Sequence, residues 1–301
     1  MRARRAGEFR IKPCVLADGA TSMTDNANDT YARSCDHWSE AGRAEMDAFY
    51  TLATEDYRHL AEAHDWAAWL AEHQRAAGDR SLRLLDVACG SGKFPTALRL
   101  HAAIETADIV PIAYDLLDPS AFSIAEARAA LGPPFVAGAE FETPLQDFAV
   151  PAGPYDIVWA THALYAVPLA ELDAAMERFV AAIGGTGFIA NAAADSHYIR
   201  FYRAFLDSFH GGAGEMYRTG EEIVASLRRL GATVTVREIS YVQRSDDDVV
   251  VEGYLQRCAF DDTVSLEAMR STSPMAEYLN GCQTDGTWGF AQRVAMIFVT
   301  S

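Results

Sequence analysis

Paired cysteines, long apolar runs and basic patches are all missing from this sequence. Its 301 residues include five scattered cysteines without a CxxC motif, so neither a disulfide framework nor a metal site is expected. No apolar run reaches the length of a membrane span. With 42 acidic and 25 basic side chains, the net charge of −17 disfavours nucleic acid as a partner. We therefore expect a cytoplasmic protein, monomer or homodimer, that binds a small molecule rather than nucleic acid or membrane.

The N-terminal segment is basic but has no apolar stretch of a secretory signal behind it. Met23 begins "MTDNANDTYARS", which is similar to a natural start. The sequence predicts that residues 1–22 form a disordered leader and that residues 23–301 form one domain.

Beyond residue 75 the chain alternates between strand-like and helix-like segments. Residues 40–74 predict a long helix because they are rich in Ala, lack Pro and carry apolar residues at helical spacing. The expected strands cover 82–88, 109–117, 134–138, 155–164, 185–193, 232–241 and 293–301, and the expected helices cover 94–101, 121–131, 169–183, 196–209, 221–230 and 249–260. This alternation is typical of an α/β fold: a doubly wound, Rossmann-like, mixed seven-stranded sheet with an antiparallel C-terminal edge.

The stretch "LRLLDVACGSGKFPTALRL" places two glycines between a buried strand and a helix start. Asp86 ends the strand, and Ala88 opens a turn in which Gly90 and Gly92 carry no Cβ. A ligand can approach the backbone closely there and meet the free N–H groups of the helix. Because Pro95 stands where a third glycine would complete the dinucleotide pattern, the turn by itself also fits a tight connection without a ligand.

The ends of the next strands narrow the choice. They read "YDLLDPS", in which an acidic residue can accept both hydroxyls of a ribose, then "GAEFETPLQDF", and the fourth strand is "YDIVWATHALY". Together with the turn, residues 80–190 resemble the class I S-adenosylmethionine-dependent methyltransferases. The resemblance implies S-adenosylmethionine as cofactor, S-adenosylhomocysteine as product, and a cofactor site at Asp86, Ala88, Gly90, Gly92, Asp118, Pro119, Ser123, Glu142, Thr143 and Thr161.

Residues 30–301 also resemble the histamine N-methyltransferase family. The similarity lies in "FYTLATED", "LLDPSAFSIAEAR", "HALYAVPLAELDAAMERF" and "MYRTGEEIVASLRRLGATV", followed by an acidic segment and "YLQRCAF". It implies that Glu55 and His162 contact the acceptor and that Tyr165 and Tyr202 form aromatic walls. His162 stands where that family has Gln, and Ala166 replaces its second Tyr.

These resemblances imply methyl transfer to a small molecule, either to an amine nitrogen or to another nucleophile of specialised metabolism. We expect residues 40–75 and 191–230 to form a helical lid and a substrate cap over the cofactor-binding core at 80–190. Glu55 or His162 would orient the acceptor or take its proton. Two alternatives stay open: an O- or C-methyltransferase for an anionic or phenolic intermediate held by Arg200, Arg203 and Arg218, and a non-catalytic S-adenosylmethionine-binding protein.

Overall fold

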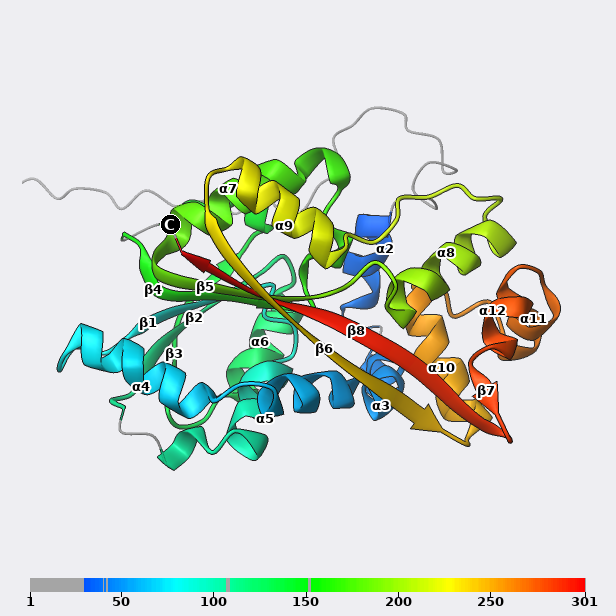
Figure 1. The fold of residues 1–301 in the computed structure, drawn as a ribbon, viewed down its shortest axis with the longest axis horizontal. Helices are drawn as coiled ribbons and strands as arrows, with labels where there is room; N and C mark the ends of the chain where they lie inside the picture. The colour runs from blue at the N-terminus through cyan, green and yellow to red at the C-terminus, as the bar shows by residue number, and fades with distance from the viewer. Residues whose placement is uncertain (1–29, 40, 42, 107–108, 151–152, 301) are drawn as a thin grey trace, which may run out of the picture.

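A twisted eight-stranded sheet runs through the centre of the molecule (Figure 1). The computed structural model describes residues 30–39, 41, 43–106, 109–150 and 153–300. The predicted leader, residues 1–22, lies outside the described residues. The strands are β1 (Arg83–Val87), β2 (Ile112–Asp118), β3 (Phe135–Glu142), β4 (Tyr155–Thr161), β5 (Ile183–Ala192), β6 (Thr233–Ser245), β7 (Gln283–Thr284) and β8 (Thr287–Thr300).

The strand order confirms the predicted doubly wound, mixed sheet. The strands lie in the order β3–β2–β1–β4–β5–β8–β6, and the first five are parallel. Strand β8 runs antiparallel to both β5 and β6. The eighth strand, β7, is a two-residue strand paired with the start of β8, too short for apolar alternation to reveal. Because the order reverses between β1 and β4, a crevice is expected at their carboxyl ends.

Helices cover both faces of the sheet. The helices of the described residues, including those that lie beyond the sheet, are α2 (Thr30–His37), α3 (Arg43–Glu62), α4 (Trp66–Ala77), α5 (Lys93–His101), α6 (Ala121–Ala130), α7 (Leu172–Ala182), α8 (His197–Phe209), α9 (Gly220–Arg229), α10 (Asp248–Ala259), α11 (Leu266–Ser271) and α12 (Met275–Asn280). Short 3-10 turns occupy Ile104–Thr106, Leu145–Asp147, Leu164–Ala166 and Leu169–Glu171. Helices α4, α5 and α6 pack on one face through Trp66, Phe94 and Ile124, while α7 and α9 pack on the other through Phe179 and Ile223.

A third apolar cluster lies beyond one end of the sheet. It joins the N-terminal half of α3 to α8, α10, α11 and α12, and the start of β8 reaches into it (Figure 1). Helix α10 approaches α3 closely because Gly253 has no side chain: an added Cβ would lie 2.9 Å from that of Ala48. We call this cluster of helices the cap.

The expected helix at 40–74 is two helices. Asp65 separates α3 from α4, and its carboxylate caps the second helix by accepting the N–H of Ala68 at 2.9 Å. The expected substrate cap at 191–230 also divides: α8 joins the cap, whereas α9 packs beside α7 on the sheet. Residues 248–280 complete the cap, and an apolar pattern alone does not reveal which layer a helix will join.

Candidate active site

The turn after β1 is built from three residues in the left-handed backbone region. Ala88, Gly90 and Gly92 have φ angles of 51°, 51° and 68°. An added Cβ on Gly90 would meet no protein atom within 4 Å, so this glycine opens the backbone toward the crevice. An added Cβ on Gly92 would lie 3.0 Å from the side chain of Ala130 in α6. The second glycine therefore serves helix packing, which differs from its expected place facing the ligand.

Asp118 joins the end of β2 to this turn. Its Oδ2 accepts the N–H of Gly90 at 3.1 Å, and its Oδ1 accepts the N–H of Ser120 at 2.9 Å. Burial raises the pKa of Asp118 to about 6, although the two backbone donors favour the ionised form. At neutral pH the carboxylate is charged and keeps lone pairs for further hydroxyl donors.

A cavity of about 360 Å³ lies over the carboxyl ends of β1, β2 and β4. Of the ten predicted cofactor residues, nine line it: Asp86, Ala88, Gly90, Asp118, Pro119, Ser123, Glu142, Thr143 and Thr161. Gly92 is the exception. We call this space the cofactor cavity.

The cofactor cavity is acidic. Asp86, Asp118 and Glu142 line it against a single lysine, Lys93. Burial raises the pKa of Asp86 to about 7, and the Tyr114 hydroxyl donates to its Oδ2 at 2.6 Å. Carboxylates beside an open backbone suit a ligand with hydroxyls and positive groups, as S-adenosylmethionine has.

Helices α2 and α3 cover the cofactor cavity. The Ser91 hydroxyl donates to the Tyr50 hydroxyl at 3.1 Å, and Lys93 Nζ lies 4.1 Å from the centre of the Tyr50 ring. Trp38, just after α2, donates from its indole N–H to the Tyr165 hydroxyl at 2.9 Å. Helix α2 was not predicted from the sequence, because one short helix without a clear apolar stripe gives little periodic signal.

A smaller cavity of about 80 Å³ continues from the first one toward the cap. Four residues, Trp38, Tyr57, His162 and Tyr165, line both spaces. The other lining residues are mostly aromatic or apolar: Phe49, Ala53, Asp56, Asn191, Ala192, Tyr198, Ile199, Tyr217, Arg257, Cys258 and Phe260. We call this space the acceptor cavity.

His162 stands at the junction of the two cavities. It follows β4 directly and has a φ of 52°, a strained angle for a residue with a Cβ. Burial lowers the pKa of its imidazole to about 4, so the ring is neutral at physiological pH. Its Nε2 is enclosed and has no hydrogen-bond partner among the described residues.

The remaining predicted acceptor residues occupy three different environments. Tyr165 lines both cavities, as expected. Tyr202 lines neither cavity. It stacks on Tyr217, a lining residue of the acceptor cavity, with ring centres 3.8 Å apart, and so packs behind that lining. Glu55 lines neither and is 42% exposed, paired with Arg58 on the outer side of α3. The geometry does not support Glu55 as an acceptor contact.

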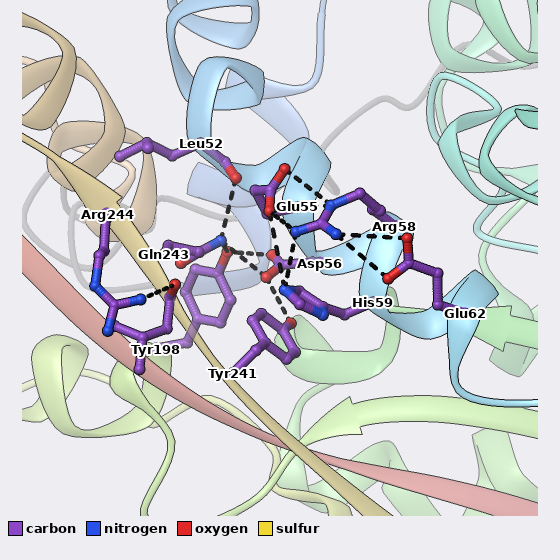
Figure 2. A network of polar contacts seen from close by, with 11 residues as sticks. Leu52, Glu55, Asp56, Arg58, His59, Glu62, Tyr198, Tyr241, Gln243 and Arg244 are labelled. Carbon is purple, nitrogen blue, oxygen red and sulfur yellow. Dashed lines mark hydrogen bonds and ion pairs between the residues drawn. The ribbon is translucent and has the colours of Figure 1, made fainter. Parts of the chain in front are cut away.

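The carboxylate that α3 supplies to the acceptor cavity is Asp56. Figure 2 shows it pointing inward among Tyr198, Tyr241 and Gln243, while its neighbour Glu55 points toward Arg58. Burial raises the pKa of Asp56 to about 7, and the tyrosine donors act against this rise. Asp56 was not among the predicted site residues, although its spacing from Phe49 and Ala53 places it on their face of the helix.

Residues 57–235 match the model of a family described as a methyltransferase domain, which covers more than half of the chain. No curated protein sequence matches the chain. Similar solved structures include magnesium protoporphyrin IX methyltransferase from Synechocystis PCC 6803 with S-adenosylhomocysteine, at 13% identity and a TM-score of 0.49, covering 89% of this chain and 99% of that one.

Two further structures are similar in the same way. The plantazolicin methyltransferase BpumL with S-adenosylhomocysteine has 10% identity and a TM-score of 0.47, covering 92% of this chain and 98% of that one. An S-adenosylmethionine-dependent methyltransferase from Leishmania major has 13% identity and a TM-score of 0.46, covering 92% of this chain and 87% of that one.

Of the helices that the structure describes, none combines the length and hydrophobicity of a membrane span.

Proposed function

Because the chain belongs to the methyltransferase domain family and is an S-adenosylmethionine-dependent enzyme, we propose that it methylates a small molecule held in the acceptor cavity. The observation that carries this proposal is the continuity of the two cavities. Both cavities are lined by the same four residues, Trp38, Tyr57, His162 and Tyr165. A cofactor in one cavity and an acceptor in the other would therefore contact each other beside His162. Proximity and alignment are the main contributions such an enzyme makes.

The residues of the cofactor cavity fit S-adenosylmethionine, which supplies a methyl group already activated on a sulfonium. Asp118 would accept the ribose hydroxyls, and the open backbone at Gly90 would lie along the methionine part. Asp86 offers a second carboxylate, and Glu142 and Thr143 line the cavity at the end of β3.

The acceptor cavity favours a flat or branched molecule with few polar groups. Its volume of about 80 Å³ and its tyrosine, tryptophan and phenylalanine walls exclude water from the reacting atoms. His162 would donate or accept one hydrogen bond as a neutral imidazole and so hold the nucleophile in line. A ring whose pKa is lowered to about 4 is a weak base at neutral pH, so its role is positioning.

An amine nitrogen is the first candidate for the nucleophile. A second candidate, an oxygen or carbon of an anionic or phenolic molecule, is favoured by Arg257, which lines the acceptor cavity with its guanidinium 4.6 Å from the Trp38 ring. The three arginines expected for that role do not line it: Arg200 and Arg203 are exposed, and Arg218 pairs with Glu222 at 3.3 Å.

We propose that cofactor binding and acceptor selection belong to different parts of one domain. Residues 23–301 would act as one methyltransferase domain, in which the sheet binds the cofactor and the cap with α2 and α3 selects the acceptor. Aromatic groups from α3 and α8 line the acceptor cavity together with Arg257 and Cys258 from α10, which supports this division.

Two measurements test the proposal. Calorimetry should show micromolar binding of S-adenosylhomocysteine, about −8 kcal/mol. Incubation with methyl-labelled S-adenosylmethionine and a panel of small amines and phenols should transfer label. Ile199→Ala should reduce the transfer without changing cofactor affinity, because Ile199 lines the acceptor cavity and not the cofactor cavity. Cofactor binding without transfer to any member of a broad panel would favour the non-catalytic alternative.

A further inference from the structure

Asp56 is the one carboxylate among the described residues that line the acceptor cavity. It lies on α3, is 3% exposed, and lines the cavity beside Tyr57. A buried carboxylate costs free energy unless it is hydrogen-bonded, so an acid in a wall of aromatic side chains needs a specific reason to be there.

Three donors from two other elements hold this carboxylate. Its Oδ1 accepts the Tyr241 hydroxyl at 2.6 Å and the side-chain N–H of Gln243 at 2.8 Å, both from β6. Its Oδ2 accepts the hydroxyl of Tyr198 from α8. Figure 2 draws these contacts. A carboxylate has about four lone-pair positions. One position on Oδ2 is therefore left without a donor among the described residues, and the Asp56 side chain lines the cavity.

The groups around Asp56 permit it to be charged when an acceptor arrives. The titratable or charged groups that act on it or line its cavity among the described residues come from α3, α8, β6, α10 and the segments that follow β4 and precede α9. They are Glu55, Tyr57, His162, Tyr165, Tyr198, Tyr217, Tyr241, Tyr254, Arg257 and Cys258, and the amide of Gln243 donates to its Oδ1. The tyrosine hydroxyls stabilise the carboxylate, whereas burial and the charge of Glu55 oppose it. The balance puts the pKa near neutrality, which suits a group that gains and loses a proton during turnover.

We propose that Asp56 accepts the hydrogen of the acceptor's nucleophilic N–H or O–H group through the open position on Oδ2, and takes that proton as the methyl group is transferred. The acceptor's lone pair forms the new bond to carbon, the electrons of the carbon–sulfur bond pass to sulfur, and the proton passes to Asp56. Solvent regains the proton after product release.

The inference rests on the proposed function and narrows its substrate class. Acceptors should carry at least one hydrogen on the nucleophilic atom, as primary and secondary amines, phenols and enols do. Tertiary amines and thioethers have no such hydrogen, and they would leave the open position on Oδ2 buried without a donor.

Binding of matched probe pairs tests this assignment. Protein loaded with S-adenosylhomocysteine is titrated at pH 8 with phenol and anisole, and separately with aniline and N,N-dimethylaniline. We expect phenol and aniline to bind about ten to a hundred times more tightly than their methylated partners, the range of a hydrogen bond to a charged group. In Asp56→Asn this preference should fall about tenfold. Glu62→Gln, the same change on the exposed side of α3, should leave it intact.

A second variant keeps the test decisive if Asp56→Asn does not fold. Tyr241→Phe removes one donor to the carboxylate, so the pH below which the preference for phenol over anisole is lost should rise by about one unit. A role in packing alone predicts no such shift. Equal binding of both probes by the wild type, or an unchanged preference in Asp56→Asn, overturns the assignment. Failure of the proposed function looks different, because S-adenosylhomocysteine itself would then not bind or no methyl group would be transferred.

Discussion

Replacing Asp118 with alanine should cripple cofactor binding while leaving the fold in place. The Asp118 carboxylate lies at the carboxyl end of β2 and accepts the backbone N–H groups of Gly90 and Ser120. Asp118 also lines the cofactor cavity, where a ribose would place two hydroxyls. The substitution removes both hydrogen bonds to the ribose hydroxyls. It also removes the bond to the N–H of Gly90 that holds the turn.

The size of the effect follows from the number of bonds. A hydrogen bond to a charged group contributes about 1.5–3 kcal/mol, so the loss of two corresponds to about 3–6 kcal/mol, or roughly 10²- to 10⁴-fold in affinity. Asp115→Ala is the matched control. Asp115 lies on the same strand and also accepts a backbone N–H, that of Ala139 at 2.8 Å, but it does not line the cofactor cavity.

The assay is calorimetric titration with S-adenosylhomocysteine, with urea unfolding measured in parallel. We expect Asp115→Ala to lose stability and keep its affinity, and Asp118→Ala to lose affinity. Affinity should also fall as the pH drops through about 6, because Asp118 becomes protonated there. Equal affinities in Asp118→Ala and the wild type would refute the assignment of the ribose site.

Three further predictions concern single residues. Gly90→Val should abolish S-adenosylhomocysteine binding, because a branched side chain at φ 51° costs about 1–2 kcal/mol and projects into open cavity space; micromolar binding in calorimetry would contradict this. His162→Gly should unfold in urea with a free energy about 1 kcal/mol higher than His162→Ala, because only glycine accepts φ 52° without strain, and equal values would show that the backbone relaxes. The free energy of unfolding should fall by up to about 1.4 kcal/mol per pH unit for each of Asp56 and Asp86 as the pH rises from about 4 toward 7, because folding raises both pKa values to about 7 and the protonated forms favour the native state. Asp56→Asn should show a shallower pH dependence in urea titrations at pH 5 and 7, and an unchanged slope would contradict the raised pKa.

The cofactor side of the molecule was largely predictable from the sequence. Local signals determine it: β1 and β2 are short, mostly apolar runs with an acidic residue at or next to the carboxyl end, Asp86 in β1 and Asp118 in β2. Parallel strands bring their carboxyl ends to one edge, so residues far apart in the chain meet without any knowledge of packing. Gly92 was expected to face the ligand, but its missing Cβ leaves room for α6 instead. A glycine that faces a ligand and one that faces a helix have the same sequence signal.

The acceptor side depends on tertiary packing and was less predictable. Its walls include Trp38 and residues of α3, α8 and α10, whose order around the cavity is set by the cap cluster and not by a repeating strand pattern. Tyr202 shows the difficulty. It is aromatic, buried and on the predicted helix, yet it stacks behind Tyr217 and does not face the cavity. The family resemblance predicted that Tyr202 lines the acceptor site, but it lies one layer of side chains behind the cavity lining.

The choice between Glu55 and Asp56 shows where periodicity contains more information than motif similarity. Successive residues of an α-helix are about 100° apart, so two adjacent acids cannot face the same partner. Phe49, Ala53, Asp56, Tyr57 and Leu60 are spaced as i, i+4, i+7, i+8 and i+11, which is the pattern of one buried face. The structure confirms that this face turns inward and that Glu55 pairs with Arg58 outside it. A carboxylate within an apolar stripe is costly unless it is used or fully paired, and Asp56 retains one open lone-pair position at the acceptor cavity. The helical pattern therefore points to Asp56 as the functional acid, although the family motif selects its neighbour.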